Sequence, residues 1–298
     1  MKEPSRIIGE YGTGAQGDLL FVTAGIHGNE PSGVIALQYV FRTLATDNPT
    51  VHGKVVGISG NLAALEKDVR YIEEDLNRVW TNEKIAQNIP QTHEQKEMRQ
   101  IISTLENYPA QHFGKRYFLD CHTTSSKSLP YISVQEVNDN DSWAHKFPTY
   151  IVRGFSDLIQ GDIDHYLSRT GLTGFVFEGG QHTSRSAIEN HEGMIWLALK
   201  EALHLDLEAL SCYPQCVEHF STHNAPGQKT FEIVYRHGLD QGDVFEMVPG
   251  FQNFDPVHKG QLLAHQNGRP IYSEHQGHIF LPLYQAKGND GFFIIKEV

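Results

Sequence analysis

The sequence of 298 residues contains few cysteines and no long apolar segment. Cys121, Cys212 and Cys216 are a small, odd number, which is typical of reduced thiols in a cytoplasmic protein. Cys212 and Cys216 could form half of a metal site, but no second cysteine pair completes it. No stretch of about 18 apolar residues could form a transmembrane helix, and the first residues contain no apolar core of a signal peptide. We therefore expect a cytoplasmic protein without a membrane partner.

Positive charge is also scarce. Lys and Arg number 24 against 36 Asp and Glu, which gives a net charge of -12, and no cluster of basic residues occurs. Such a balance argues against nucleic acid as a partner. A small acidic ligand remains compatible with the sequence only if arginines gather locally at its binding site.

Strands and helices alternate over the first 210 residues. Apolar runs at 18–26, 54–58, 116–120 and 174–177 predict strands, and apolar residues at helical spacing predict helices after Pro31 and over 184–204. Residues 94–107 predict a polar surface helix. This alternation is typical of an α/β fold with a mixed, mostly parallel sheet and helices on both faces.

The pattern changes after residues 211–228, which show no clear periodicity and predict a linker. Short apolar runs at 231–235, 244–248, 260–264, 279–284 and 292–295 follow, separated by Gly, Asp, Asn and Pro. We therefore predict a catalytic domain over 1–210 and a small all-β C-terminal domain over 226–298.

Potential metal ligands follow the predicted strands. His27 and Glu30 lie in the turn GIHGNE, His122 follows the strand 116–120, and Glu178 ends the strand 174–177. Ligands gather at the carboxyl ends of strands in open α/β sheets. Two histidines, one carboxylate and a fourth position open to water are typical of catalytic zinc, with Glu178 as a candidate general base. Asp120 could bind one of these metal-ligating side chains and fix its orientation.

Each of these residues also has a structural interpretation. The chain has 17 histidines, so about one H-x-x-E pattern is expected by chance, and one occurs, at His27 and Glu30. Glu178 could cap the glycine turn that follows it, and Asp120 could simply end its strand. From spacing alone, a zinc site and a set of structural residues both remain open.

The segment RYIEEDLNR contains the local arginines that an acidic ligand needs. Arg70 and Arg78 each present a planar fork suited to carboxylates. The alternative is a solvated loop in which these arginines pair with Glu73, Glu74 and Asp75.

Four motifs in order, GIHGNE, RYIEEDLNR, LDCHTT and FEGG, resemble the succinylglutamate desuccinylase and aspartoacylase family, a branch of the zinc carboxypeptidase-like fold. The segments GFQNFDPVHKGQLL and LPLYQ extend the resemblance to the C-terminal region. The resemblance implies one zinc ion held by His27, Glu30 and His122, with Glu178 as the general base. It implies hydrolysis of the amide bond of a small acidic N-acyl amino acid.

The resemblance also implies roles for the remaining polar residues. Arg70 would polarise the scissile carbonyl and stabilise the oxyanion. Asn77 and Arg78 would bind a substrate carboxylate, on a loop that Asp75 fixes. Tyr284, in LPLYQ, would reach the substrate from the C-terminal domain.

Two departures from the family pattern concern the substrate pocket. The family's base begins a longer E-x-G-x-Q pattern, whereas here Glu178 is followed by Gly-Gly-Gln. Arg169, nine residues before Glu178, is a candidate for the family's substrate-binding arginine. His182 either lines the site or lies on the surface.

Two other functions stay open at this point. A zinc carboxypeptidase acting on short peptides would use the same ligands, but the C-terminal domain is implied to narrow the mouth of the site. A non-catalytic sensor of acyl amino acids would have no need of Glu178. The aromatic C-terminal strands could form a homo-oligomer interface or only the core of their own domain.

Overall fold

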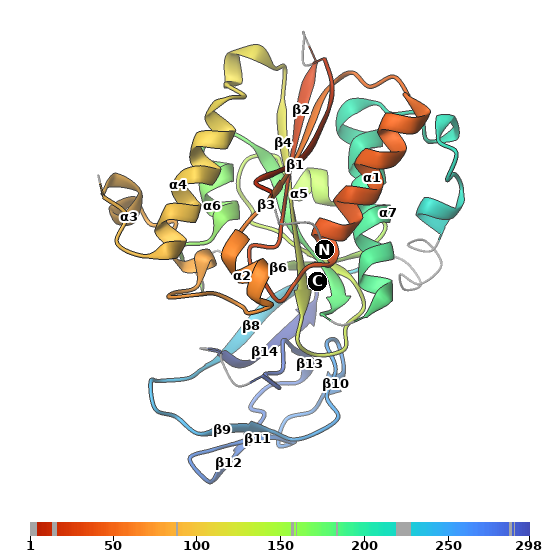
Figure 1. The fold of residues 1–298 in the computed structure, drawn as a ribbon. Helices are drawn as coiled ribbons and strands as arrows, with labels where there is room; N and C mark the ends of the chain where they lie inside the picture. The colour runs from red at the N-terminus through yellow and green to blue at the C-terminus, as the bar shows by residue number, and fades with distance from the viewer. Residues whose placement is uncertain are drawn as a thin grey trace.

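The computed structural model describes residues 5–13, 17–87, 89–155, 158, 160–182, 184–218, 228–285, 288 and 290–298. A mixed sheet of 11 strands runs through the molecule (Figure 1). In spatial order its strands are β1 (Ile7–Gly12), β3 (Gly53–Ser59), β2 (Asp18–Ala24), β4 (Arg116–Thr124), β7 (Thr173–Gln181), β5 (Tyr131–Ser133), β6 (Tyr150–Arg153), β8 (Thr230–Gly238), β14 (Asp290–Glu297), β13 (Gly277–Phe280) and β10 (Pro256–Val257).

Helices cover both faces of this sheet. On one side lie α1 (Ser32–Asp47) and α7 (Arg185–Leu203), and on the other lie α4 (His93–Glu106) and α6 (Ile163–Arg169) (Figure 1). The shorter helices are α2 (Leu62–Lys67), α3 (Asn82–Ala86) and α5 (Asn140–Ala144). Because each helix buries an apolar stripe against the sheet, a separate hydrophobic cluster forms on each face. The predicted α/β fold class is confirmed.

The strands that carry the candidate site are parallel neighbours. β2 pairs in parallel with β3 and β4, and β4 pairs in parallel with β7. The side chains of Leu19, Leu20, Phe21 and Val22 are fully buried, as expected for a strand covered on both faces. Parallel strands end at the same edge of a sheet, so the segments after β2 and the ends of β4 and β7 come together. Here β4 and β7 run on through His122 and Glu178, which are register partners.

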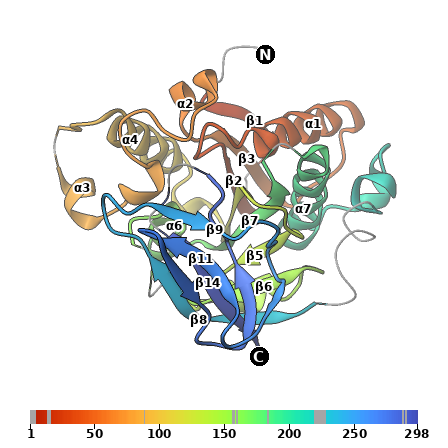
Figure 2. The same ribbon diagram turned by 90° about the horizontal axis from the view of Figure 1, so that it is seen from below.

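The C-terminal strands continue the central sheet. β8 pairs in parallel with β6, and β14, β13 and β10 follow in antiparallel order. A separate antiparallel sheet is formed by β12 (Arg269–Tyr272), β11 (Leu262–Gln266) and β9 (Phe245–Met247). It lies at the bottom of Figure 1, and Figure 2 shows the molecule from below. The predicted linker lies partly outside the described residues, at 219–227. The boundary between 210 and 226 stays a prediction.

Two expectations about single elements were wrong. The strand predicted over 279–284 ends at Phe280, because Leu281 takes a left-handed backbone conformation with φ of 48°. Helix α4, predicted as a surface helix, buries Glu94, Gln95 and Glu97 because their side chains bind neighbouring segments. Among the described helices, none is both long and apolar enough to cross a membrane.

Candidate metal centre and substrate cavity

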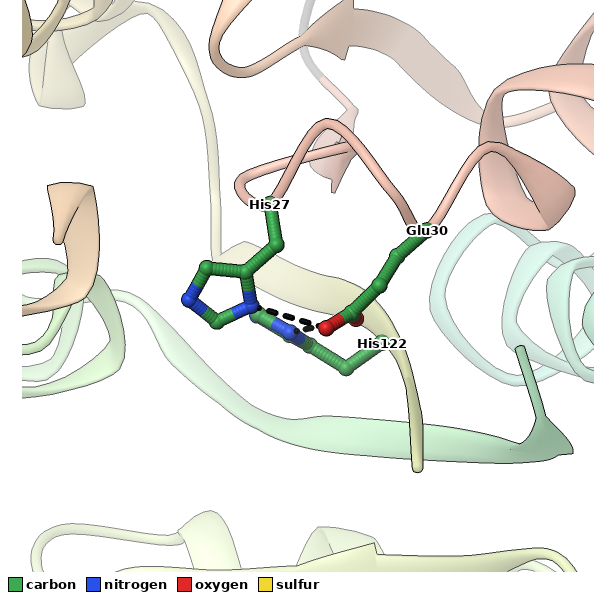
Figure 3. Close-up of side chains that lie close together, drawn as sticks. All are labelled: His27, Glu30 and His122. Atoms are coloured by element: carbon green, nitrogen blue, oxygen red, sulfur yellow. Dashed lines mark hydrogen bonds and ion pairs between the residues drawn. The ribbon is translucent and has the colours of Figure 1, made fainter. Parts of the chain in front are cut away.

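The turn after β2 carries the first two candidate ligands. Its glycines are sterically required, since a Cβ on Gly28 would lie 2.0 Å from the carbonyl carbon of Ala64 in α2. The backbone amide of Glu30 donates to the carbonyl of His27, which closes the turn. Both side chains therefore emerge on the same side of the sheet edge (Figure 3).

His27, Glu30 and His122 converge on one point (Figure 3). His27 Nδ1 lies 2.9 Å from Glu30 Oε1, and His122 Nδ1 lies 3.1 Å from Glu30 Oε2. All three residues are at most 4% exposed, and their potential ligand atoms lie within 4.8 Å of one another. The structure thus brings together the three ligands predicted from the sequence.

The opposite ring nitrogens of the two histidines contact carboxylates. His27 Nε2 lies 3.0 Å from Asp75, and His122 Nε2 lies 2.9 Å from Asp120, which is fully buried. An ionised carboxylate only accepts hydrogen bonds, so each Nε2 donates. In a neutral ring the Nδ1 lone pair then faces the oxygens of Glu30. Three acceptors facing one another in a buried site require a positive charge between them, from a proton or a metal ion.

Glu178 lies beside this cluster, opposite His122 in the register of β4 and β7. Its Oε2 atom is buried and receives no hydrogen bond from the described residues. Burial, together with the charges of Glu30 and Asp120, raises the pKa of Glu178 to about 8. A carboxyl group with such a pKa can accept and return a proton near neutral pH.

The arginine segment is folded against the metal cluster. Arg70 donates through Nε and Nη2 to Asp75 Oδ2 at 3.2 and 3.0 Å, and its Nη1 lies 3.7 Å from Glu30 Oε1. Asp75 therefore contacts both Arg70 and His27. Glu73 and Glu74 do not pair with the arginines, because their carboxylates bind the start of α4 and Lys84.

Arg78 and Asn77 differ in what their side chains face. Arg78 lines the cavity described below, and its Nη1 donates to the carbonyl of Asn77 at 2.6 Å. The side-chain oxygen of Asn77 accepts from the amide of Ile163, at the start of α6. Asn77 thus connects the arginine segment to α6, while Arg78 faces the cavity.

Arg169 and Tyr284 lie away from the cluster. Arg169 is exposed at the end of α6, where it donates to the carbonyls of His165 and Trp80. The Tyr284 hydroxyl accepts from the amide of Phe251 and donates to the carbonyl of Val248, at 2.9 Å in each case. Neither residue lines the cavity, and their predicted substrate contacts stay predictions.

The structure places His182, which the sequence left open between the site and the surface, and adds His191, which the sequence did not indicate. His182 lines the cavity, and its Nδ1 lies 2.8 Å from the hydroxyl of Thr123, whose amide donates to Glu30. His191, on α7, is fully buried and packs so closely under Gly179 that a Cβ there would lie 2.5 Å from its ring. Neither contact could be read from the sequence. The first depends on how the end of β7 lies beside β4, and the second on how α7 packs against β7.

The three candidate ligands and Glu178 line a cavity of about 220 Å³, together with Arg70, Arg78 and His182. The α/β part of the chain and the C-terminal region each supply part of its wall. Its lining residues are His27, Glu30, Arg70, Tyr71, Asp75, Arg78, His122, Thr123, Thr124, Ser125, Glu178, His182, Leu281, Leu283, Gln285, Gly288, Asp290 and Phe293.

Known proteins are similar to this chain in sequence and in fold. Residues 16–158 match the sequence profile of the succinylglutamate desuccinylase/aspartoacylase catalytic domain. A succinylglutamate desuccinylase of Pseudoalteromonas atlantica is 25% identical over 277 residues, which cover 87% of this chain and 75% of that protein. In sequence, the chain matches the succinylglutamate desuccinylase/aspartoacylase family.

Solved structures extend this likeness to the whole fold. A succinylglutamate desuccinylase/aspartoacylase from Rhodobacter sphaeroides superposes with a TM-score of 0.71 at 16% identity, over 95% of this chain and 87% of that one. Murine aminoacylase 3 superposes with a TM-score of 0.65 at 17% identity, over 97% of both chains. The profile match contains the three candidate ligands and the arginine segment, whereas Glu178 lies beyond it.

Proposed function

We propose that this protein is a zinc-dependent hydrolase that cleaves the amide bond of an N-acyl amino acid. The observation that carries the proposal is the convergence of His27, Glu30 and His122 in a cavity that also contains Glu178. Two imidazoles and a carboxylate are a common ligand set of catalytic zinc. The family relatives named succinylglutamate desuccinylase support an acyl amino acid as the substrate class.

The donor set fits zinc in its charge as well as in its composition. Both Nδ1 atoms face the Glu30 carboxylate, and both Nε2 atoms are held by Asp75 and Asp120. A zinc ion held by these side chains would act as a Lewis acid, which lowers the pKa of water and polarises a carbonyl.

The remaining polar groups have separate roles in this proposal. Glu178 takes a proton from the attacking water and passes it to the leaving amine nitrogen, so that one carboxyl group serves both steps. Arg70 contributes a fixed positive charge beside the oxygen that becomes negative. Its bonds to Asp75 hold it in place before substrate arrives, so little reorganisation is needed during the reaction.

Arg78 is the proposed binding group for the substrate carboxylate. It is one of two arginines that line the cavity in the described part of the chain, and the other, Arg70, is bound to Asp75. The C-terminal residues Leu281, Leu283 and Phe293 form an apolar wall. A cavity of about 220 Å³ with such a wall suits a small substrate better than a long peptide.

The first test is amine release from a panel of N-acyl amino acids that includes N-acetylaspartate and N-succinylglutamate. We expect turnover of at least one member, lost on treatment with a metal chelator and restored by zinc. Glu178→Gln should lower kcat by at least about 100-fold with the metal content unchanged, because the proton acceptor is removed. Full activity of the Glu178→Gln protein, or turnover that is insensitive to chelation, would contradict the proposal.

A further inference from the structure

Glu94 is a buried acidic residue far from the candidate ligands in sequence. It lies in the first turn of α4 and is 0% exposed. A carboxylate can be buried at low cost when several N–H groups donate to it, and the start of a helix favours negative charge. What matters is therefore which groups donate to Glu94.

Four N–H groups donate to this carboxylate. Oε1 accepts from the Asn61 side chain at 3.0 Å and from the Ile72 amide at 2.7 Å. Oε2 accepts from the amides of Glu73 and Glu74, both at 3.2 Å. Three of the four donors are consecutive backbone amides in the middle of the segment that runs from Arg70 to Arg78.

Side chains of the same segment accept hydrogen bonds from the start of α4. The Glu73 carboxylate accepts from the His93 amide at 2.7 Å. The Glu74 carboxylate accepts from the Thr92 hydroxyl at 2.6 Å and from the Gln95 side chain at 2.9 Å. Residues 72–74 are therefore held to α4 from both directions, by their amides and by their side chains.

The ends of the segment reach the candidate site. The carbonyl of Arg70 accepts from the amide of Gly28, in the turn that carries His27, and Asp75 contacts His27 itself. Arg78 lines the cavity three residues after Asp75. A shift of residues 72–74 would thus move Arg70, Asp75 and Arg78 relative to the metal ligands.

We infer that Glu94 is a positioning residue, which sets the place of Arg70 and Arg78 in the cavity by binding the backbone between them. This inference rests on the proposed function, because it assigns Glu94 a part in the same reaction. Glu94 contacts none of the proposed reacting groups and acts only through the segment.

Glu97 offers a matched control on the same helix. Its side chain is 4% exposed, and it binds the amide of Leu62 and the Arg6 guanidinium instead of the arginine segment. The variants Glu94→Gln and Glu97→Gln thus remove the same charge from equally buried positions. Only Glu94→Gln places an amide N–H against the amides of residues 72–74.

The experiment compares the two full-length, zinc-loaded variants with the unmodified protein. For Glu94→Gln we expect a 10- to 100-fold loss of kcat/KM with a raised KM, since displacement of a positioning group by about 1 Å has effects of this size. We also expect at least about tenfold faster hydrogen exchange at residues 72–74, with metal content unchanged. Glu97→Gln should retain the unmodified KM and the unmodified exchange in this segment.

The KM separates positioning from a loss of folded protein, which lowers the apparent kcat and leaves KM unchanged. If Glu94→Gln does not fold, Glu94→Asp, which is one methylene shorter, is measured in its place with the same readouts. Unchanged kcat/KM and exchange in the Glu94 variant, or equal effects in the Glu97 variant, would overturn the inference. If no panel member is turned over, the proposed function fails, and the exchange comparison alone decides whether Glu94 holds the segment.

Discussion

Pairs of carboxylate and histidine recur at the candidate metal centre. Asp75 and Asp120 reach their histidines from different elements, and each leaves Nδ1 directed at Glu30. The orientation of the rings is thus determined outside the set of ligands. The sequence motif predicted the ligands and suggested Asp120. The contact of Asp75 with His27 depends on the folded arginine segment and could not be read from the motif.

A buried carboxyl group elsewhere in the chain leads to a prediction about pH. Asp164 is 6% exposed and accepts from the Gln135 side chain at 2.6 Å, and burial, with Asp162 nearby, raises its pKa to about 8. The folded protein therefore favours the neutral form. The stability that the protonated Asp164 contributes is fully present below pH 4, which is about the pKa of an Asp in the unfolded chain. It is lost as the pH rises towards 8, the pKa of Asp164 in the folded protein.

Asp164→Asn keeps this position neutral at every pH. Relative to the unmodified protein, the variant should gain stability on the order of 4 kcal/mol between pH 4.5 and pH 8, at about 1.4 kcal/mol per pKa unit. Urea unfolding at the two pH values measures this difference, with Asp139→Asn, at an exposed position, as the control. An equal effect of Asp164→Asn at both pH values would show that Asp164 does not retain its proton on folding.

At the scale of elements, the contact of β7 with α7 places Glu178. A Cβ on Gly179 would lie 2.5 to 2.9 Å from three ring atoms of His191, which is fully buried and has no room to retreat. Gly179→Ala should therefore destabilise the protein by about 1–3 kcal/mol and lower kcat/KM by displacing Glu178. Gly238→Ala, in β8, is the control because nothing lies within 4 Å of its added Cβ. Thermal melting and steady-state kinetics measure both effects, and a Gly179→Ala protein as stable and active as the control would refute this account.

The elements that the sequence predicted well are those with a strong local signal. The runs at β2, β3, β4 and β7 are apolar and long enough to be recognised, and α7 is strongly periodic. The strands β1, β5 and β6 were missed because β1 is a mixed edge strand and the other two have only three and four residues. The burial of α4 was missed because Glu94 and Gln95 bind the arginine segment, while Glu97 binds Leu62 and Arg6. Periodicity does not report such contacts.

At the scale of the whole molecule, the central sheet joins the two predicted domains. Phe231, Phe280 and Phe293, from the C-terminal strands, share one hydrophobic cluster with Tyr131 and Val152, from β5 and β6. The pairing of β6 with β8 links the same parts through backbone hydrogen bonds. Because Phe293 also lines the cavity, the packing of the C-terminal strands helps to define the proposed substrate site.

This shared cluster predicts that the chain unfolds as one cooperative unit. The Phe280 ring is fully buried and lies 4.9 Å from that of Tyr131, centroid to centroid. Phe280→Ala should lower the free energy of unfolding by about 3–5 kcal/mol, since truncation leaves a cavity between the two parts. Val244→Ala, at a position 71% exposed in the C-terminal region, should cost far less. Calorimetry should show a single transition at a lower temperature in Phe280→Ala. A different outcome is two unfolding transitions, of which only the one from the C-terminal region shifts in Phe280→Ala. The two parts would then be independent domains, and the cavity wall could open without unfolding the candidate metal centre.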